Sequence, residues 1–428
     1  MFTATGMVVG GTIGVGIFLT PAEMAKQAGS PGLLLLVWTF LAVMALAGAL
    51  CFGELASRFP EAGGSYVYLH EAFGSGVAFL YGWKCLLVMD PGLTAALATG
   101  LGAYAALLVP GVPAKGVALA GIAIVAAANL GGVRLAAGLS QILAVAKIAV
   151  LLALVGFGFF SSAGDASHLA PLFARRPESP ALFPALAGAV VSGFFSFGGW
   201  WEMSKLAGEV DDAPRNVPRA LFLGVLTVAL LYVSVSAVFL FLVPLETVQS
   251  SETFAAQTGS ALFGARGGAV LSAVVFLSVL GSLFGFMTMA PRVYYAMARA
   301  GAAPAWLGDL GPSGAPVRAI LLQSALAMAL VAVGTFQAIV AYFVFVTVAF
   351  LGLTVAGLLV LRRRGGPRPL VEAPFHPWCA ALFLASVGVV LALLLAGRPA
   401  QAILGVLVVG FGWPVHLWRT RHLLRDAA

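Results

Sequence analysis

Long apolar runs, separated by short polar segments, follow one another along almost the whole chain. Each run approaches the ~20 residues that an α-helix needs to cross a bilayer. Because the runs are continuous and do not alternate between apolar and polar residues, they predict helices rather than strands. The pattern predicts twelve membrane-spanning helices, over residues 3–28, 33–57, 74–109, 115–130, 135–160, 184–207, 217–243, 267–299, 317–335, 338–361, 378–396 and 400–418.

Composition supports an all-α membrane protein. Hydrophobic residues make up 61% of the 428 residues, charged residues only 9%, and the mean hydropathy is +1.03. A soluble domain of this length would carry far more surface charge. The first apolar run lacks a basic leader and is rich in glycine, so we expect it to be a true first helix rather than a signal peptide.

The net charge of +7 is explained by topology rather than by nucleic acid, for which we expect no binding. With the N-terminus in the cytoplasm, 15 of the 23 lysines and arginines face the cytoplasm and 6 face outward. The other two, Lys84 and Lys147, lie inside predicted helices. The positive-inside rule therefore predicts that both termini are cytoplasmic.

Side chains that commonly carry catalysis or bind metals do not cluster. The three cysteines, Cys51, Cys85 and Cys379, have neither metal-site nor disulfide-framework spacing. The five histidines show no zinc-type spacing, and the chain has no phosphate-binding loop of the P-loop kind. We therefore expect no metal, no cofactor and no enzyme activity. An ion channel, which needs a pore lined by polar rings, and a membrane enzyme remain remote alternatives.

Glycines interrupt two of the helices at matching places. The first contains GGTIGVGIF (10–18) and the sixth SGFFSFGGWW (192–201), with Gly14 and Gly198 separated by 184 residues. A unit of five spans reverses the direction of entry, so this spacing predicts an inverted repeat with a binding site at the paired interruptions. The predicted units are 1–160, 184–361 and two additional helices in 378–418. The alternative reading is that these glycines only allow close helix packing.

Six stretches in this order resemble the amino acid–polyamine–organocation superfamily, and bacterial relatives of the L-type amino acid transporters in particular. They are GTIGVGIFLTP (11–21), GELASRFPEAGGSYVYL (53–69), LSQILAVAKIAVLLAL (139–154), FFSFGGW (194–200), AGEVDDAPRNVPRAL (207–221) and APRVYYAMARAGAAP (290–304). One departure is Val15, where many L-type members have serine. The resemblance implies a five-plus-five inverted-repeat core of the leucine-transporter type, unwound in helices 1 and 6, and alternating access for amino acids, often by exchange.

A broken helix can bind a zwitterion without any charged side chain. The start of a half-helix offers unpaired N–H groups and a positive dipole end, and the end of a half-helix offers unpaired carbonyls. We assign the substrate carboxylate to the N–H groups of Val15, Gly16 and Ile17, beside Gly14. We assign the ammonium to the carbonyls of Ile13, Phe195 and Ser196, beside Gly198.

Aromatic residues around the second break are expected to form the walls of the site. Phe197 and Trp200 are the candidates, with Trp201 as a further one, and Phe195 matches the family's gating aromatic. Apolar walls favour a neutral, apolar substrate side chain.

Charges inside apolar helices are rare and are functional candidates. By resemblance, Lys147 occupies the family's helix-5 lysine position, near the place where related folds bind sodium. Its ammonium is expected to bind carbonyls around residues 11–14 and the hydroxyl of Ser278 or Ser282, as a tethered replacement for the ion or as a proton-releasing group. Asp90 is a candidate for proton coupling, for reading a polar substrate, or for a satisfied carboxylate. Glu202 and Lys205, three residues apart, predict a local ion pair.

Charges at matching positions in two cytoplasmic loops predict an inner gate, with a plain solvated loop as the alternative. They are Glu54, Arg58, Glu61, Glu209, Asp211, Asp212, Arg215 and Arg219.

These features together predict a secondary transporter of amino acids, favouring neutral L-amino acids, that works as a sodium-independent exchanger or a proton symporter. A transporter of cationic amino acids or polyamines with the same fold is the alternative. Eukaryotic relatives join a partner through a cysteine between helices 3 and 4, and no cysteine lies there in this chain. We therefore expect no heavy-chain partner and a monomer or homodimer in the lipid bilayer.

Overall fold

The computed structural model describes residues 1–14, 16–61, 63–131, 133–177, 179–248, 254–299, 301–397 and 399–426. These residues form helices joined by turns and loops, and no strand occurs among them. Eight helical spans within them are long and apolar enough to cross a membrane: Pro31–Arg58, Ser75–Leu108, Leu182–Gly208, Ala213–Leu242, Arg266–Arg299, Ala338–Arg364, Trp378–Gly397 and Ala402–Arg419. A bent pair, Ala4–Thr12 with Gly16–Ala28, can form a ninth span, and three shorter apolar helices are Ala114–Leu130, Val145–Phe159 and Val317–Val333. The predicted all-α membrane fold is confirmed, and each predicted segment overlaps one of these helices.

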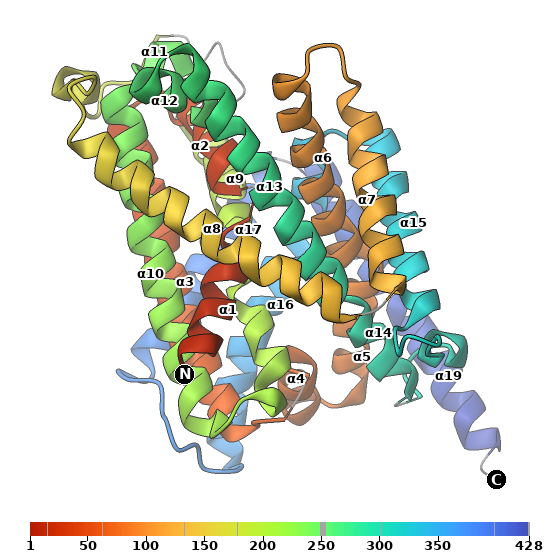
Figure 1. Ribbon diagram of the computed structural model, residues 1–428. Helices are drawn as coiled ribbons and strands as arrows, with labels where there is room; N and C mark the ends of the chain where they lie inside the picture. Colours follow the sequence, from red (N-terminus) through yellow and green to blue (C-terminus); the bar gives the residue numbers. More distant parts are fainter. Residues whose placement is uncertain are drawn as a thin grey trace.

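The first part of the chain runs from α1 to α8 (Figure 1). Its elements are α1 (Phe2–Thr12), α2 (Gly16–Ala28), α3 (Pro31–Arg58), α4 (Ser65–Phe73), α5 (Ser75–Lys84), the π-helix η1 (Cys85–Met89), α6 (Asp90–Leu108), α7 (Ala114–Leu130) and α8 (Val133–Phe159). The second part contains α9 (Leu182–Phe197), the 3₁₀-helix η3 (Trp200–Glu209), α10 (Ala213–Leu242), α12 (Phe254–Phe263), α13 (Ala265–Met289), α14 (Pro291–Arg299), α15 (Val317–Val333) and α16 (Phe336–Arg364). The chain ends with α17 (Trp378–Gly397), α18 (Pro399–Gly410) and α19 (Gly412–Asp426).

Two short helices, α4 and α12, were not predicted as separate elements. They lie at opposite ends of the molecule (Figure 1). A turn with positive φ at Gly63 (131°) and Gly64 (53°) precedes α4, and Gly74 (φ 86°) separates it from α5. Only glycine adopts such angles without strain. The chain therefore turns at the membrane edge before the third span begins.

Helices from the two predicted repeat units pack against each other. The α2 helix packs on α9, α3 on α10, α6 on α13, and α7 on α15. This arrangement brings the two interrupted helices into contact at the centre of the bundle. The division of the chain into repeat units stays a prediction.

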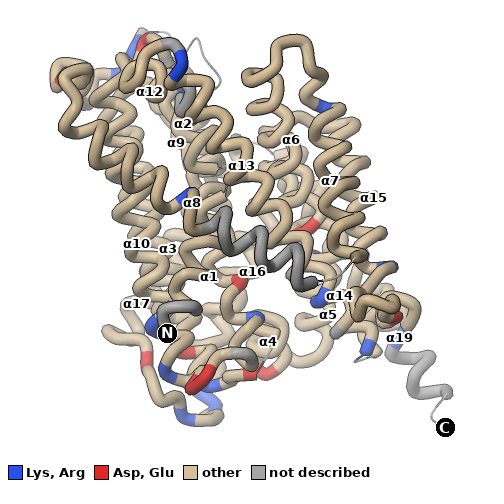
Figure 2. The backbone as a smooth tube through the Cα atoms, viewed as in Figure 1, with Lys and Arg blue, Asp and Glu red and all other residues tan. Residues whose placement is uncertain are grey.

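Charged residues are concentrated at one end of the molecule. Both termini lie at that end (Figure 1), where most lysines, arginines, aspartates and glutamates gather, whereas few occur along the middle of the bundle (Figure 2). The uncharged middle is the band expected for the hydrocarbon core of a bilayer. The few charges within it therefore need specific partners.

Candidate functional site

The first helix breaks where the glycine motif predicts. The α1 helix ends at Thr12, α2 begins at Gly16, and their axes differ by 43°. Ile13 is extended, with φ −72° and ψ 90°, and Val15 lies outside the described residues. The first N–H groups of a helix have no partner within it, so Gly16 and Ile17 start a half-helix with unpaired backbone donors. The assignment of a substrate carboxylate to them stays a prediction.

The sixth helix breaks at a glycine pair, and the second glycine occupies the position that requires glycine. Gly198 has φ −63°, which any residue adopts, whereas Gly199 has φ 105° in the left-handed region. A Cβ atom on Gly199 would also lie 2.8 Å from the Gly11 carbonyl oxygen. The two broken helices therefore touch through backbone at Gly11 and Gly199, three residues before the predicted centre of the first break and one residue beyond that of the second.

A second close approach joins the two breaks further along α2. A Cβ atom on Gly16 would lie 2.6 Å from Ser196 Cα, which is closer than real side chains allow. The Thr20 and Ser196 hydroxyls are 2.6 Å apart, and the buried Tyr232 hydroxyl donates to the carbonyls of both Thr12 and Ser196 (3.1 Å each). In this conformation Gly16 serves helix packing directly, beside its predicted role at the substrate.

Lys147 joins α8 to the broken end of α1. It is only 3% exposed, and its ammonium donates to Gly10 O (2.5 Å), to Ile13 O and to Ser282 Oγ on α13 (3.1 Å). Three donors thus meet three acceptors, as a buried ammonium requires. Of the two candidate serines, Ser282 is the one whose hydroxyl accepts a hydrogen bond from the Lys147 ammonium. Among the described residues the Ser278 hydroxyl has no partner, and its carbonyl accepts from Ser282 Oγ (3.2 Å).

The three carbonyls assigned to a substrate ammonium already accept hydrogen bonds within the chain. Ile13 O accepts from Lys147, Phe195 O accepts from Gly198 N (3.1 Å), and Ser196 O accepts from Tyr232. A carbonyl oxygen has two lone pairs, so Phe195 and Ser196 each keep capacity for one further donor. Ile13 has less capacity, because the Ser282 hydroxyl also lies 3.4 Å from its oxygen.

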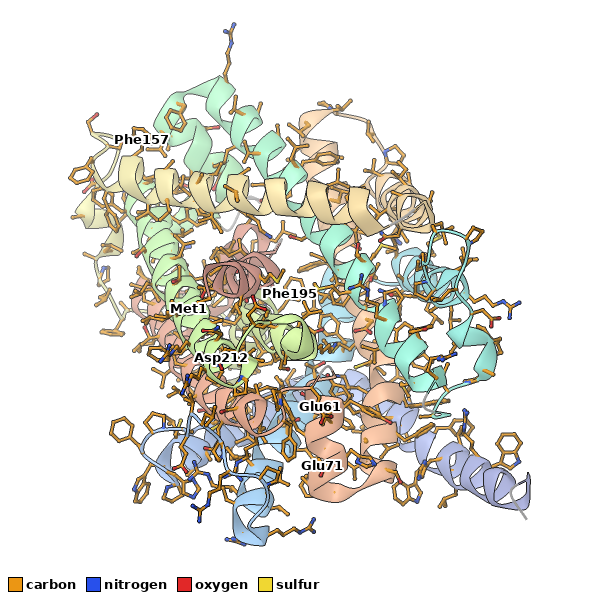
Figure 3. The ribbon with its side chains drawn as sticks, turned by 60° about the horizontal axis from the view of Figure 1, so that its bottom comes forward. Met1, Glu61, Glu71, Phe157, Phe195 and Asp212 are labelled. Atoms are coloured by element: carbon orange, nitrogen blue, oxygen red, sulfur yellow. The ribbon has the colours of Figure 1, made fainter. Side chains whose placement is uncertain are left out.

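The predicted wall aromatics face different ways. Phe195, near the centre of the bundle in Figure 3, packs edge-on against Phe336 and Phe343 of α16, with ring centroids 5.4 and 6.1 Å away. Phe197 instead packs on Trp38 and Tyr232, at 5.7 and 5.2 Å. Phe195 therefore lies between helices in the way a gate residue would.

The tryptophans after the break also pack into the protein. Trp200 meets Phe52 of α3 at 5.2 Å, and Trp201 stacks on Phe194 at 6.2 Å. A cavity of about 10 Å³ remains beside Trp200 and Phe197, enough for about one water molecule. Phe197 and Trp200 thus serve packing in this conformation, and the sequence pattern did not distinguish this from a wall position.

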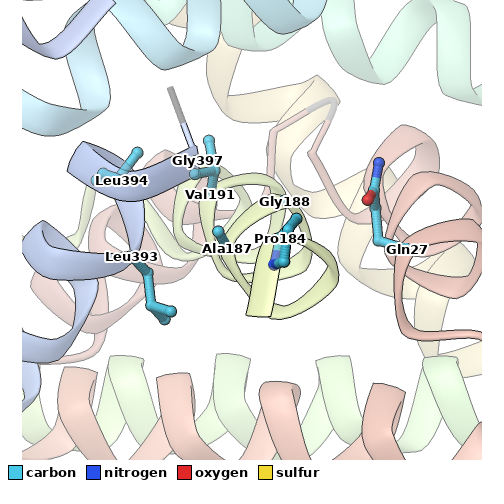
Figure 4. A pocket seen from close by; sticks show the side chains of 8 residues that line it. All are labelled: Gln27, Pro184, Ala187, Gly188, Val191, Leu393, Leu394 and Gly397. Atoms are coloured by element: carbon cyan, nitrogen blue, oxygen red, sulfur yellow. The ribbon is translucent and has the colours of Figure 1, made fainter. Parts of the chain in front are cut away.

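A larger cavity lies elsewhere, between α9, α17 and the end of α2. Its volume is about 180 Å³, and seven of its eight lining residues are apolar or glycine, with Gln27 as the polar one (Figure 4). The Gln27 amide donates to Glu23 (2.9 Å). Neither cavity is lined by residues 10–17 of the first break.

One of the predicted inner-gate charges, Glu54, accepts several hydrogen bonds. The buried Glu54 carboxylate accepts from Arg58 (2.9 and 3.0 Å), from Arg362 at the end of α16, and from Ala373 N (2.8 Å). Arg215 reaches only the exposed Asp212 (3.6 Å), and the side chain of Glu209 lies outside the described residues. Figure 3 shows Asp212 and Glu61 on this face of the molecule.

Arg362 was missed as a site residue because the run 362–364 reads as a helix stop. The Ser57 hydroxyl also accepts from Leu370 N and Val371 N (2.9 and 3.0 Å). The end of α3 therefore holds the loop that follows α16.

The other charges inside the helices each have a partner of their own. Asp90 accepts from the Tyr294 hydroxyl on α14 (2.6 Å), and the Lys84 ammonium lies 4.6 Å from the centroid of the Tyr81 ring. The predicted ion pair of Glu202 and Lys205 is present, at 2.5 Å. Among the described residues, no group of three or more His, Cys, Asp or Glu side chains is arranged to bind a metal.

Comparison with known proteins agrees with this architecture. The family model described as "Amino acid permease" matches residues 1–413. The chain therefore belongs to the amino acid permease family, which consists of membrane transporters and not enzymes.

Several mammalian transporters are similar over nearly the whole chain. The mouse (Mus musculus) large neutral amino acids transporter small subunit 2 is 28% identical over 97% of this chain and 80% of its own length. The mouse Asc-type amino acid transporter 1 is 26% identical over 98% of this chain and 81% of its own length. The mouse b(0,+)-type amino acid transporter 1 is 27% identical, over 97% and 90%.

Proposed function

We propose that this permease carries neutral L-amino acids by alternating access without sodium. The observation that carries the proposal is the Lys147 ammonium between α1 and α13. It binds Gly10 O, Ile13 O and Ser282 Oγ, and so places a fixed positive charge where, by resemblance, related folds bind sodium. A site already filled by a covalently attached cation has no need of a free one.

The preference for neutral substrates rests on the chemistry of the first break. The N–H groups of Gly16 and Ile17 open α2 and suit a carboxylate, and the carbonyls of Phe195 and Ser196 keep capacity for an ammonium. Phe195 offers an apolar contact to the substrate side chain. The name of one similar protein specifies large neutral amino acids. Cationic amino acids or polyamines remain the alternative, which the buried carboxylate of Asp90 would favour.

The proposal extends to the cycle and the architecture. Residues 1–160 and 184–361 form two inverted five-helix units around the breaks, and 378–418 add two helices. Phe195 closes the outer side, and charges at the ends of α3 and η3 close the inner side. The cycle is amino acid exchange, or proton symport if Lys147 or Asp90 releases a proton during the cycle.

We also propose a cytoplasmic position for both termini, in a bacterial inner membrane. The charged end of the molecule holds both termini (Figure 2), as the positive-inside rule requires. One similar protein is named a small subunit. Because the segment between α6 and α7 has no cysteine, we propose that this chain works without a disulfide-linked partner, as a monomer or homodimer.

Counterflow in proteoliposomes tests the function. Vesicles loaded with an unlabelled amino acid should accumulate the same labelled amino acid in sodium-free buffer, and alanine, serine or leucine should compete better than arginine or a polyamine. Lys147→Ala should lose at least 90% of the rate. Lys115→Ala is the matched control, because Lys115 is exposed and, within the part of the chain that the structure describes, donates to Ala332 O alone (3.2 Å). Strict sodium dependence of the wild type, or full activity of Lys147→Ala, would refute the proposal.

A further inference from the structure

Four charges from three elements interact inside the cytoplasmic half of the bundle. Lys84 on α5 is 1% exposed and Asp90 at the start of α6 is fully buried. Glu202 and Lys205 on η3 have side chains 12% exposed. Asp90 interacts electrostatically with all three of the others. We call these four residues the charge cluster; its formal net charge is zero.

The position of the charge cluster relative to the breaks follows from helix geometry. Gly14 at the first break faces Leu97 of α6, since a Cβ atom there would lie 3.6 Å from Leu97 Cδ2. Asp90 lies seven residues before Leu97, so it is on the same face of α6 and about 10 Å nearer the charged end of the molecule. Lys205 lies six residues beyond Gly199 on η3. The charge cluster therefore lies between the broken helices and the charged end of the molecule.

The charge cluster also lies at the boundary between two groups of helices. The η3 helix packs on α1, α3 and α10, whereas α5 packs on α14, and α6 on α13, α15 and α16. Glu202 and Lys205 thus belong to one group, and Lys84 and Asp90 to the other. The η3 helix is joined to α9 only through Gly198 and the left-handed Gly199. A 3₁₀ segment inside a spanning helix often marks a hinge.

The bonding within the charge cluster is incomplete. Among the described residues, one carboxylate oxygen of Asp90 (Oδ1), one of Glu202 (Oε1) and the Tyr81 hydroxyl have no hydrogen-bond partner. The contacts of the Lys84 ammonium are the rings of Tyr81 and Phe350, at 4.6 and 5.8 Å. The charges across the boundary are therefore held by attraction in a low dielectric rather than by short ion pairs.

This contrasts with the other buried acid of the cytoplasmic half. Glu54 accepts from two arginines and a backbone N–H, and both its oxygens are used. Opening a fully bonded buried ion pair costs several kcal/mol. The charge cluster keeps spare acceptors, so its members can exchange partners or take up water when the two groups of helices separate.

We propose that the charge cluster is an inner latch, in which Lys205 on η3, attracted by Asp90 on α6, keeps the cytoplasmic side closed until η3 rotates about Gly199. Lys84, Glu202 and Lys205 are then positioning residues for transport. Other titratable groups at the latch are Tyr81 on α5, Cys85 on η1 and Tyr294 on α14. The proposal rests on the alternating-access cycle proposed above.

The native Cys85 reports opening of the latch. It is fully buried, follows Lys84 directly in the chain, and its carbonyl oxygen lies 3.4 Å from the Tyr294 hydroxyl that binds Asp90. In a background with Cys51→Ala and Cys379→Ala, a membrane-impermeant maleimide added to inside-out vesicles should label Cys85 slowly. Lys205→Met and Asp90→Asn should each raise the labelling rate about tenfold, and the double variant should raise it no further, because each single change already breaks the same attraction.

A charge swap separates the latch from a local ion pair. Glu202→Lys with Lys205→Glu restores a pair within η3 but places a carboxylate against Asp90, so we expect labelling to stay fast. Lys205→Arg keeps the charge and should label at the wild-type rate. The control is Arg318→Met, which removes the cation of an exposed ion pair with Asp309 (2.6 Å) and should change nothing.

The labelling rates distinguish an inner latch from a local ion pair within η3. Wild-type labelling rates in the single variants, or a swap that fully restores slow labelling, would overturn the latch. Size-exclusion elution and thermal unfolding show whether each variant is folded. If a single variant is not folded, the labelling rates of Lys205→Arg and of the charge swap test the latch instead. Labelling needs no substrate, so failure of counterflow in the wild type would refute the proposed function while leaving the latch measurement intact.

Discussion

Adding one methyl group at either of two adjacent glycines should have very different effects. Gly199→Ala places a Cβ atom on a residue with φ 105° and 2.8 Å from the Gly11 carbonyl oxygen. Gly198→Ala places the same group on a residue with φ −63°, where the nearest atom is Phe195 O at 3.1 Å. The two variants carry the same substitution at adjacent positions, so they differ only in the backbone conformation and the neighbours of the substituted residue.

The size of the difference follows from two costs. A non-glycine residue in a left-handed conformation costs of order 1–3 kcal/mol. Overpacking costs a further ~1–3 kcal/mol, because the neighbour of Gly199 is backbone that moves only if α1 moves. We expect Gly199→Ala to lower the free energy of unfolding by about 2–4 kcal/mol, allowing for partial relaxation. Gly198→Ala needs a shift of a few tenths of an ångström and should cost below ~1 kcal/mol.

Thermal unfolding in detergent and counterflow in proteoliposomes measure the two variants. Gly199→Ala should melt several degrees below the wild type and lose most counterflow, because the shift of α1 disturbs both breaks. Gly198→Ala should keep at least half of the wild-type rate. Equal loss in both variants would show that the glycine pair is needed for room at the substrate, and that the backbone contact at Gly199 is not the constraint.

Three further substitutions test the surroundings of the breaks. Tyr232→Phe removes a buried hydroxyl that donates to the carbonyls of Thr12 and Ser196, and should cost about 1–3 kcal/mol in thermal unfolding; no loss would mean that water replaces it. Thr20→Val removes the hydroxyl paired with Ser196 and should cost about 1 kcal/mol, with a smaller effect on counterflow than on the melting temperature. Glu54→Gln leaves two arginines without their buried carboxylate and should cost about 3–5 kcal/mol, so a variant with wild-type unfolding would contradict a structural role.

Sequence reasoning succeeded where physics leaves one solution. An apolar run of bilayer length must be helical because its backbone has no other partners in lipid, so the twelve segments could be predicted. A lysine in mid-membrane needs acceptors, and Lys147 has three. The sequence could not predict which serine Lys147 binds. Ser278 and Ser282 are one turn apart on the same face of α13, and only the packing of α13 against α8 determines which hydroxyl lies next to the ammonium.

The misses depend on contacts between distant parts of the chain. Glu54 and Arg362 are 308 residues apart, and hydropathy indicates only that each lies near the end of a predicted span. Gly198 and Gly199 look alike in sequence, and only the backbone angle shows which one must be glycine. Phe197 is as aromatic as Phe195, yet it packs inward because α3 and α10 lie on its side of α9.

The backbone contact between Gly11 and Gly199 also determines how far a rotation at the second break moves the far end of η3. Because neither residue has a side chain, the two backbone segments touch at one point. At such a contact η3 can rotate against α1 more easily than it can slide along it. The η3 helix has ten residues, which at ~2.0 Å per residue makes a rigid arm of about 20 Å. A turn of roughly 10° at Gly199 would move the far end of this arm by about 3.5 Å, about the width of a water molecule, so in the proposed cycle a small rotation at the break would be enough to open the inner end of η3.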